Sequence, residues 1–587
     1  MKTFWFILFV CSCLSLIGQS NSSCIEVKGR ILNKETKEPI PYVNIFNYHS
    51  KNGTISDLKG YFKISVHSVK DTLFVSSVGF KKQMIRLSEK KSFYTLYMEE
   101  NIQLLDAVSI IAPDDSYLYD LLVDCKKNSS TINRTTKAYY EIKSYTGDNQ
   151  IEMLEAFFNA DLKGYDLSEL ELKTGRFALK KTGNRFFNSM ESSRAIIMNS
   201  LFAENEYFPQ NPLGFSHSKM KKKFYLELEK KYLENTFDSI YVIRYVPKDT
   251  SGLFFSGRIW VNPQKKHVIK ATFECENCKV TPFIPLFSTD KMSNINLNIT
   301  KTYREIDGKM FFNHVDFTYQ FDYDSRIDSA DEANYRILTN AVLHVYDYEN
   351  IFFIPKFRFD DNCVRDYLKI AAMPYNDFFW ENKNEFEIID HDNQNKQFYI
   401  ENEAFSNRTW YSDNQCIKKV YESPFIKWSE KRRVLIKDFT EDGIESNPSN
   451  TGIIADKYNL SVKIFMDINT YSDSTNVITS TVFDPWETFY HLPVDTATNC
   501  FLNIYFDICE IERKKFEKAI ANLGNNRAEI IRKYDEMNAK LDKLKKQYLK
   551  EVDRGLNKEE FEKWNQYVAK SIGINNFKLF NYIGVNP

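Results

Sequence analysis

The stretch Gly257-Arg258-Ile259-Trp260-Val261-Asn262, followed after a short polar turn by Val268-Ile269-Lys270-Ala271-Thr272-Phe273, indicates the fold of the middle of the chain. Both segments are rich in the β-branched and aromatic residues that half-buried strands prefer, and apolar side chains recur at alternating positions. The turn near Asn262-Pro263 predicts that the two strands pair as a hairpin.

Strand-like segments continue on both sides of this hairpin, for example Ile240–Tyr245 and Phe317–Phe321. The chain has 47 Phe and 35 Tyr among 587 residues, and abundant aromatic residues in such segments favour sheet structure. We therefore predict one large antiparallel sheet between residues 136 and 350.

The first 20 residues have the pattern of a signal peptide: Lys2, the apolar run Phe4–Val10, and then Gly18-Gln19-Ser20. This pattern predicts export to the periplasm or the outer envelope, with no transmembrane span in the mature chain. A membrane anchor is the alternative, but the apolar run is short of the ~20 residues that span a bilayer. A lipoprotein modified at Cys13 or Cys24 is disfavoured, because neither cysteine follows the usual Leu-x-Gly/Ala pattern.

The composition limits the class of partner. The 78 Lys and Arg residues nearly cancel the 79 Asp and Glu residues, so the net charge of −1 gives no global field that would attract nucleic acid. A length of 587 residues predicts three or four domains. Among the ten cysteines, Cys275 and Cys278 form a Cys-x-x-Cys pair, either a disulfide or two free thiols; zinc is disfavoured because no second pair lies beside it.

Residues 24–100 show the pattern of a small β module. Val27–Leu32 and Ile40–Ile45 are predicted strands joined by a polar turn, and Leu73–Phe80 is a predicted buried strand. Asp57 and Gly60 stand where a tight turn needs side-chain capping and a positive φ.

These residues resemble the carboxypeptidase regulatory-like domain, a transthyretin-like β-sandwich. The positions that carry the resemblance are Gly29, Pro39, Ile40, Val43, Gly53, Thr54, Asp57, Gly60, Phe62, Val78, Gly79 and Phe80. The resemblance implies a non-catalytic accessory module. Leu104–Ile110 is similar to the segment that follows this module in TonB-dependent receptors, but the charged, helical pattern of the last ~70 residues does not suit a receptor barrel.

Residues 257–273 resemble the open half-barrel of lipoprotein-carrier proteins, in which a curved sheet encloses an apolar cavity. This resemblance implies that the central domain could carry a lipid or another hydrophobic ligand. The alternative is that the aromatic side chains form an ordinary packed core, as expected of any buried sheet.

Two connectors flank the predicted sheet. Residues 101–135 contain a short predicted helix from Asp114 to about Ser129, whose apolar face is Leu118, Leu121, Leu122 and Cys125. Residues 351–420 form the second connector, with Asp377-Phe378-Phe379-Trp380 as aromatic anchors.

Residues 421–587 are predicted to be an α+β region that ends in long helices. Leu435–Phe439, Leu460–Phe465 and Val477–Phe483 are predicted strands. From about Asn499 the apolar residues take helical spacing, namely Phe501, Ile504, Tyr505, Ile508, Ile511 and Phe516.

The helix predicted from Arg527 to Val552 has a heptad seam shorter than three heptads. The seam consists of Ile530, Tyr534, Met537, Leu541, Leu544 and Tyr548. Its short length favours a hairpin within the chain over dimerisation. Asn557, with Glu560 three residues later, is predicted to cap the next helix.

A metal site formed by His491, Asp495, Asp507 and Glu510 was considered, because the last two residues share a helix face. The spacing lacks the paired histidines of hydrolytic zinc sites. Pairing of the acidic residues with Arg513, Lys514 and Lys515 on a solvated helix face is the simpler interpretation.

No phosphate-binding loop, dinucleotide fingerprint or nucleophile elbow is present in the sequence. His217 and His314 are interpreted as hydrogen-bonded structural residues. We assign no catalytic, cofactor or metal residue, and no cofactor.

The sequence therefore predicts a multidomain, mostly β, α+β protein: a transthyretin-like sandwich, a central curved antiparallel sheet and a C-terminal α+β region. The predicted function is that of a non-catalytic exported binding or scaffold protein of the cell envelope. Its partners would be envelope proteins, an envelope polymer or a hydrophobic ligand. A lipid carrier and a hydrolase with an unidentified active site are the two alternatives.

Overall fold

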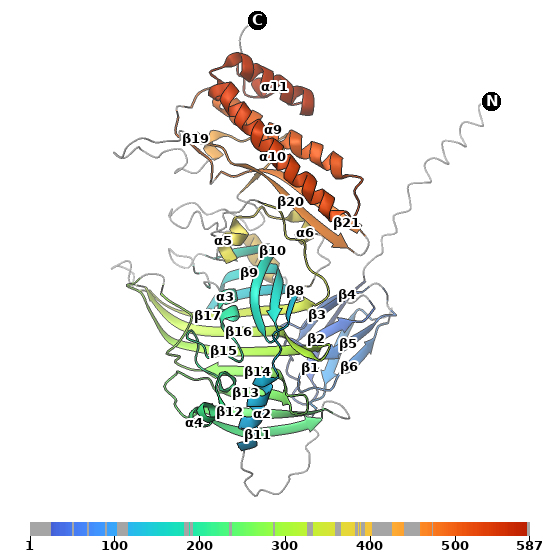
Figure 1. The fold of residues 1–587 in the computed structure, drawn as a ribbon, viewed down its shortest axis with the longest axis vertical. Coiled ribbons are helices and arrows are strands. Elements are labelled where there is room, and N and C mark those ends of the chain that lie inside the picture. The colour runs from blue at the N-terminus through green and yellow to red at the C-terminus, as the bar shows by residue number, and fades with distance from the viewer. Residues whose placement is uncertain are drawn as a thin grey trace, which may run out of the picture.

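The computed structural model describes residues 25–49, 52–66, 68, 70–88, 91–101, 116–180, 187, 189, 192–233, 238–285, 288–325, 333–357, 366–381, 386, 388, 394–401, 425–438, 458–471, 474–485, 487–492 and 494–583. The predicted signal peptide and the segment 104–110 lie outside these residues. A small β unit packs beside a large sheet, and a unit with long helices lies at the far end (Figure 1). The predicted mostly β, α+β class is confirmed.

The N-terminal unit is a sandwich of two small sheets, with strand orders β4-β1-β7 and β3-β2-β5-β6. Its strands are β1 (Ile25–Asn33), β2 (Asn44–Asn47), β3 (Asn52–Ile55), β4 (Tyr61–Val66), β5 (Thr72–Ser76), β6 (Gln83–Arg86) and β7 (Phe93–Met98). Alternate residues of both sheets, such as Ile31, Ile45 and Val75, are buried in one core. The predicted sandwich is thus present.

The predicted turn at Asp57 is also present. The Asp57 carboxylate accepts hydrogen bonds from the backbone N–H groups of Lys59 and Tyr61 at 2.9 and 2.8 Å. Gly60 has φ +80°, and a Cβ atom there would lie 2.4 Å from the carbonyl oxygen of Ile31. Only glycine meets both demands at this position.

Two predicted strands of the sandwich are shorter than expected. The strand predicted from Ile40 begins only at Asn44, because Tyr42 has φ +54° and turns the chain. The strand predicted to end at Phe80 ends at Ser76, because a turn containing Gly79 at φ +94° follows.

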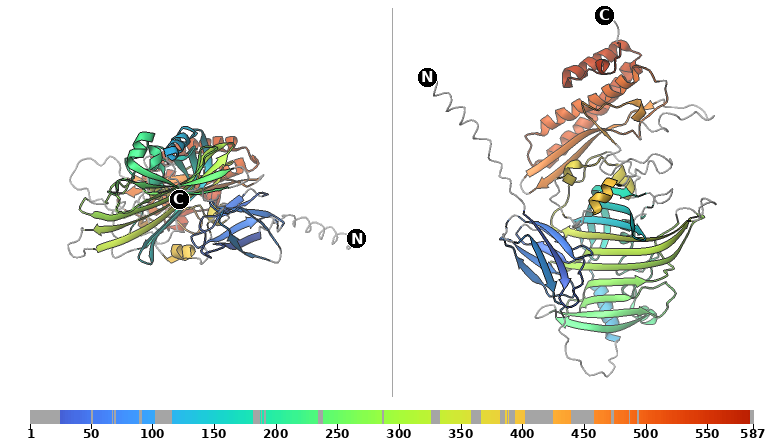
Figure 2. Two further views of the ribbon diagram at one scale, coloured as in Figure 1. Left: turned by 90° about the horizontal axis from the view of Figure 1, so that it is seen from below. Right: turned by 180° about the vertical axis from the view of Figure 1, so that it is seen from behind.

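The central unit is a ten-stranded sheet in which every neighbouring pair is antiparallel, as predicted, with order β10-β9-β8-β17-β16-β15-β14-β13-β12-β11. The sheet is curved (Figure 2). Its strands are β8 (Asn133–Thr146), β9 (Asn149–Lys163), β10 (Asp166–Leu179), β11 (Phe224–Leu233), β12 (Ser239–Pro247), β13 (Gly257–Asn262), β14 (His267–Cys275), β15 (Lys291–Ile306), β16 (Lys309–Ser325) and β17 (Ala333–Asp347).

One face of this sheet, here called the inner face, is covered by short helices. These are α2 (Ser116–Lys127), α3 (Ser192–Met198), α4 (His217–Lys223) and α5 (Asp366–Ala371). Their side chains join Phe317 and Tyr319 of β16 in the largest hydrophobic cluster. The predicted apolar face of α2 is confirmed, since Leu118, Leu122 and Cys125 are fully buried.

The opposite face, the outer face, is covered by two other parts of the chain. Ile55 of the sandwich packs there in a cluster with Tyr139 and Phe157 of the sheet. Phe379 and Trp380 of α6 (Asp377–Glu381) belong to the same cluster, so this connector is anchored by aromatic residues as predicted. Helix α7 (Gln394–Glu401) adds a smaller cluster beside them.

The C-terminal unit packs helices against a small sheet of order β18-β21-β20, with a second pair, β19 and β22. Its strands are β18 (Ile426–Lys427), β19 (Tyr458–Asn459), β20 (Val462–Tyr471), β21 (Ser474–Phe483) and β22 (Phe489–Tyr490). Its helices are α9 (Thr498–Ile520), α10 (Arg527–Val552), α11 (Lys558–Ile572) and α12 (Asn576–Leu579).

The helical predictions for this unit are confirmed. The seam of α10 packs within the chain: the Tyr534 hydroxyl donates to the Ile464 carbonyl of β20 at 2.7 Å, and the Tyr548 hydroxyl to the Phe501 carbonyl of α9 at 2.9 Å. Asn557 caps α11 by accepting from the backbone N–H of Glu560.

The predicted strand Leu435–Phe439 is wrong, and Phe439 lies outside the described residues. Ile436–Asp438 is a 3₁₀ turn. The backbone N–H groups of Val434 and Ile436 donate to side chains of α9, Asn503 and Asn499, at 3.0 and 3.2 Å. Because these backbone donors bond to α9 side chains, the segment packs along the side of α9 instead of joining a sheet.

Among the described helices, none is both long and apolar enough to cross a membrane.

Replacing Gly60 by alanine is expected to destabilise the sandwich more than replacing Gly79. Both glycines have positive φ, which costs an alanine about 1–2 kcal/mol. At Gly60 the new Cβ atom would also meet the Ile31 carbonyl, adding about 1–3 kcal/mol, whereas at Gly79 nothing lies within 4 Å. Hydrogen exchange of the β1 and β4 amides measures both losses, and equal losses would contradict the close approach at Gly60.

Candidate functional site

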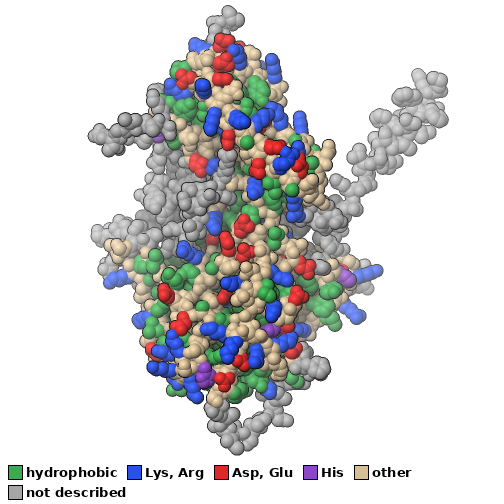
Figure 3. Space-filling model, viewed as in Figure 1, with side chains coloured by type: hydrophobic (Ala, Val, Ile, Leu, Met, Phe, Trp, Pro, Cys, Tyr) green, Lys and Arg blue, Asp and Glu red, His purple; other side chains and the backbone are tan. Residues whose placement is uncertain are grey.

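The candidate binding surface is the exposed part of the outer side of the sandwich sheet β3-β2-β5-β6. Alternation buries Val75 and Ile85 in the core and turns Phe74 and Met84, which pair across β5 and β6, to the other side. Phe74 is 41% exposed and Met84 70%. Tyr48, 71% exposed, has its ring centroid 6.4 Å from that of Phe74. We call Tyr48, Phe74 and Met84 the apolar row; hydrophobic side chains are visible on this flank in Figure 3.

The outer side of the other sandwich sheet has a different chemistry. Glu26 forms ion pairs with Lys28 and Lys63 at 2.8 and 3.5 Å. The guanidinium of Arg30 lies over the Tyr61 ring, 4.7 Å from its centroid. Charged groups therefore accompany the exposed aromatic rings on that side. Beside the apolar row, Arg86 of β6 is exposed on the same face as Met84.

The sheet that carries the apolar row is fixed to the central sheet at its opposite end. Ile55 of β3 is 1% exposed in the outer-face cluster. The Tyr42 ring lies 4.8 Å from the ring of His314 on β16. A separate contact comes from Asn101, which follows β7: its side chain donates to the Leu233 carbonyl of β11 at 2.7 Å, and its N–H donates to the Gly79 carbonyl between β5 and β6. One side of the sheet is thus buried at β3 and open to solvent at β5 and β6.

Two buried histidines of the central sheet lie at this junction, where His314 contacts Tyr42 of the sandwich and His344 contacts His314. His314 and His344 are paired across β16 and β17, with ring centroids 5.6 Å apart. Burial lowers the pKa of His314 to about 3. Burial also lowers the pKa of His344 well below the usual 6.5, and the neighbouring His314 and Arg304 add to this shift. Both rings are therefore uncharged at neutral pH.

The predicted hydrogen bonding of the lone histidines is wrong for His314. Neither ring nitrogen of His314 has a hydrogen-bond partner among the described residues. The reason is its position between the Tyr42 ring and His344, where it serves as an aromatic contact. His217 lies at the surface with its Nε2 atom 3.5 Å from the Asp120 carboxylate.

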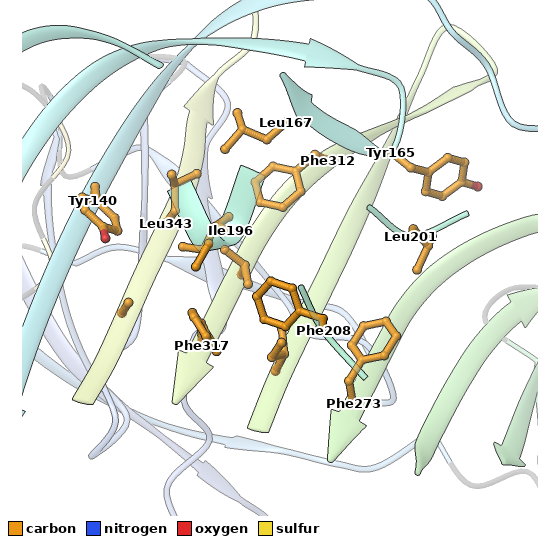
Figure 4. Close-up of a cluster of buried hydrophobic side chains, with 14 of the residues drawn as sticks. Tyr140, Tyr165, Leu167, Ile196, Leu201, Phe208, Phe273, Phe312, Phe317 and Leu343 are labelled. Atoms are coloured by element: carbon orange, nitrogen blue, oxygen red, sulfur yellow. The ribbon is translucent and has the colours of Figure 1, made fainter. Parts of the chain in front are cut away.

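The inner face of the central sheet is filled by the chain's own side chains. Aromatic rings from several strands and from the segment between β10 and β11, including Phe208, Phe273 and Phe317, pack together (Figure 4). Beside them Glu152 accepts hydrogen bonds from Ser144, from Tyr367 of α5 and, at 2.8 Å, from the backbone N–H of Ser189. These bonds fasten the covering segments to the sheet.

A small pocket lies near one edge of this packed region. It is lined by Asn128, Ser130, Tyr165, His267, Gly308, Lys309 and Met310 and has a volume of about 20 Å³. Such a volume admits a water molecule.

A buried ion pair joins the central sheet to the C-terminal unit. Lys173 of β10 and Asp467 of β20 are 1% and 0% exposed and form a direct hydrogen-bonded pair. The ammonium also donates to the carbonyl of Phe353 at 2.9 Å. The carboxylate accepts from Asn376 and Asn469 at 2.7 and 3.0 Å. Both charges are therefore fully hydrogen-bonded, which a buried pair requires.

The residues considered for a metal site do not come together. Asp507 accepts from Trp428 at 2.7 Å and from Arg433 at 2.6 Å, and Glu510 pairs with Arg513 at 2.5 Å. Among the described residues, no three His, Cys, Asp or Glu side chains could hold a metal ion.

The predicted pairing of acidic with basic residues within α9 is correct for Glu510 with Arg513 and for Glu512 with Lys515. The prediction that these acidic residues lie on a solvated face is wrong. Asp507, Glu510 and Glu512 are 0%, 1% and 3% exposed. They are buried because α9 lies between the sheet β20–β21 and the helices α10 and α11. Asp507 therefore pairs with Arg433, which is distant in sequence, rather than with a basic residue on its own helix.

Sequence reasoning missed Lys173, Asp467 and the histidine pair. Lys173 and Asp467 are 294 residues apart, and no local spacing relates them. The pairing of His314 with His344 follows from the register of β16 and β17, which the sequence pattern did not define.

Comparison with known proteins identifies the N-terminal unit. A family model for the CarboxypepD_reg-like domain matches residues 27–110, which confirms the predicted resemblance for this part of the chain. No curated protein matches the chain.

Several solved structures show a weak likeness. A LolA superfamily protein from Nitrosomonas europaea is 12% identical, with 40% of this chain and 94% of that chain covered and a TM-score of 0.17. MucB in its complex with MucA from Pseudomonas aeruginosa is 7% identical, with 39% and 93% covered and a TM-score of 0.14. A putative membrane-associated protein of unknown function from Bacteroides fragilis is 6% identical, with 55% and 98% covered and a TM-score of 0.11. Scores of this size support no conclusion about function.

Acid is expected to loosen the junction between the sandwich and the central sheet. Because burial lowers the pKa of His314 and His344, the undocked state binds more protons than the docked state. Docking is therefore at full strength above about pH 6.5 and weakens by about 1.4 kcal/mol per histidine for each pH unit below it. Small-angle scattering at pH 7.5 and 5.0 would show the expansion.

A variant with His314→Phe and His344→Phe is the control for this experiment. Burial raises the pKa of the neighbouring Asp316 to about 6, so acid favours docking through that carboxyl group. The difference between the wild type and the double variant isolates the histidine contribution. An identical pH response in both proteins would contradict it.

Breaking the Lys173–Asp467 pair is expected to destabilise the junction with the C-terminal unit. Lys173→Met leaves a buried, uncompensated carboxylate, at a cost of about 3–5 kcal/mol. Lys173→Met combined with Asp467→Asn should recover most of this loss. Arg336→Met, which breaks an ion pair whose arginine is 65% exposed, should cost under about 1 kcal/mol. Urea unfolding followed by tryptophan fluorescence measures these changes. An unchanged free energy of unfolding in Lys173→Met would contradict the structural role of the pair.

Proposed function

We propose that the chain is a non-catalytic, exported scaffold protein of the cell envelope that binds another envelope protein through the apolar row. The observation that carries the proposal is the open apolar surface of Tyr48, Phe74 and Met84 on a sheet whose far end is anchored. Neighbouring exposed apolar side chains on a soluble domain commonly mark an interaction site. Aromatic residues and methionine are also enriched at protein interfaces.

Two features support export and a scaffolding role. The leader at residues 1–20 has the pattern of a signal peptide. Parts of both faces of the central sheet are covered by other parts of the chain, and this packing is consistent with a structural role.

The same packing favours a scaffold over the two alternatives. A lipid carrier needs an apolar cavity that stays open for its ligand, whereas Phe208, Phe273 and Phe317 belong to one packed, buried cluster on the inner face. A hydrolase needs a nucleophile or metal with a positioned base, and the buried acidic side chains described above serve as partners in structural hydrogen bonds.

Replacing the apolar row with Tyr48→Ser, Phe74→Thr and Met84→Thr is expected to abolish capture of a specific envelope protein from extract. The physical reason is the loss of apolar area, at about 25 cal/mol per Å² of buried surface. Affinity capture with quantitative mass spectrometry measures the change. A partner retained by this variant would contradict the proposed surface.

The matched control replaces three exposed apolar residues elsewhere, Tyr225→Ser, Leu338→Thr and Leu556→Ser, which are 62%, 40% and 66% exposed. This control should keep the partner. Native mass spectrometry of the mature wild-type chain completes the test, because a stoichiometric lipid adduct would favour the carrier and a bound metal ion the hydrolase.

A further inference from the structure

Two cysteines lie three residues apart in the turn where β14 ends. Cys275 and Cys278 are free thiols, each 7% exposed. The Cys278 thiol donates to the Cys275 carbonyl oxygen at 3.3 Å. A hydrogen bond from the Cys278 thiol lowers the pKa of Cys275, and the same bond, with burial, raises the pKa of Cys278. Cys275 is therefore the more acidic of the two thiols.

The backbone holds the thiols in this arrangement. The N–H of Cys278 donates to the Ile295 carbonyl of β15 at 2.8 Å, and the N–H of Asn277 donates to the Asn296 side chain at 3.0 Å. Asn277 has φ +49°, which closes the turn between the two cysteines.

The turn also supports a neighbouring loop. The N–H of Lys279 donates to the Gly252 carbonyl at 3.0 Å, and the Cys275 thiol lies 3.8 Å from the same oxygen. A Cβ atom on Gly252 would lie 2.5 Å from the Asn277 carbonyl oxygen, so the loop and the turn are in close contact. A bond within the turn would hold this contact in place.

The other described cysteines have a different environment. Cys125, Cys500 and Cys509 are buried apart from one another in helices, and burial raises the pKa of each to about 12. Thiols of this kind are poor nucleophiles at neutral pH. The Cys-x-x-Cys turn is therefore chemically distinct among the described thiols.

We propose that Cys275 and Cys278 form a reversible dithiol–disulfide site, oxidised by small-molecule disulfides in the compartment to which the chain is exported. The proposal rests on the export part of the proposed function, because such pairs persist as disulfides in oxidising compartments. Its effect is to lock the turn between β14 and β15, and with it the loop at Gly252.

The exchange balances as two successive displacements. The Cys275 thiolate attacks one sulfur of the disulfide and releases a thiolate, leaving a mixed disulfide on Cys275. Cys278 gives its proton to the released thiolate, attacks the Cys275 sulfur and displaces the second thiolate, which takes up the proton that Cys275 had lost. The protein gains one S–S bond and loses two protons and two electrons, and the disulfide is reduced to two thiols.

The test uses the purified mature chain, first reduced and then equilibrated with mixtures of oxidised and reduced glutathione. After acid quenching and alkylation, the peptide containing residues 275–278 should lose about 2 Da and take up no alkylating agent under oxidising conditions, and reduction should reverse this. Peptides with Cys125, Cys500 and Cys509 should remain thiols. Two alkylated cysteines at 275 and 278 under excess oxidised glutathione would overturn the proposal.

Single variants test the separate roles. In Cys278→Ala, glutathione should remain attached to Cys275, and Cys275 should be alkylated more slowly near neutral pH because its hydrogen-bond donor is lost. In Cys275→Ala, the remaining Cys278 should react more slowly with oxidised glutathione than Cys275 does in the first variant. Cys500→Ala should oxidise at 275 and 278 like the wild type. Equal reactivity of the two single variants would overturn the assigned roles.

The failures of the two proposals are distinguishable. A pair that stays reduced overturns the disulfide site and leaves the partner-capture result unchanged. Cell fractionation that finds the chain in the cytoplasm overturns both the proposed export and the proposed oxidation in the cell. Loss of partner capture with normal oxidation concerns only the proposed binding surface.

Discussion

The central constraint on this structure is that the ten-stranded sheet carries large apolar side chains on both faces. Antiparallel sheets commonly leave one face to water, but here Phe317 and Tyr319 lie on one side and Tyr139 and Phe157 on the other. Each face must therefore be covered by protein. The short helices cover part of the inner face, and the sandwich with the segment around α6 covers part of the outer face, so the sandwich and the connector complete the central core.

The buried Lys173–Asp467 pair has a different role from these apolar contacts. Removing two charges from water costs about as much as their attraction returns, so such a pair adds little net stability. It does demand a specific geometry, because each group must meet its partner and the carbonyl or amide groups around it. We interpret the pair as fixing how β20 meets the edge strand β10, while the large hydrophobic clusters supply most of the stabilisation.

The sequence predicted what depends on local pattern. Alternation in residues 257–273 gave the hairpin and the antiparallel sheet, and helical spacing from Phe501 gave α9. It failed where distant parts of the chain decide the outcome. Leu435–Phe439 has strand-like composition, but Asn499 and Asn503 take its backbone donors. The acidic residues of α9 looked solvated because nothing in the sequence places Arg433 beside Asp507.

The candidate surface was not predicted for a related reason. Phe74 and Met84 lie in strands that alternate as those of a buried sandwich should, and Tyr48 lies in the turn after β2; alternation alone does not say which outer side is covered. Coverage depends on docking: His314 and Ile55 close one end of the sheet and leave the other open. The closed end is anchored to a packed core. An apolar surface held in place before binding loses little conformational entropy on binding, and such anchoring would suit the scaffold role that we propose.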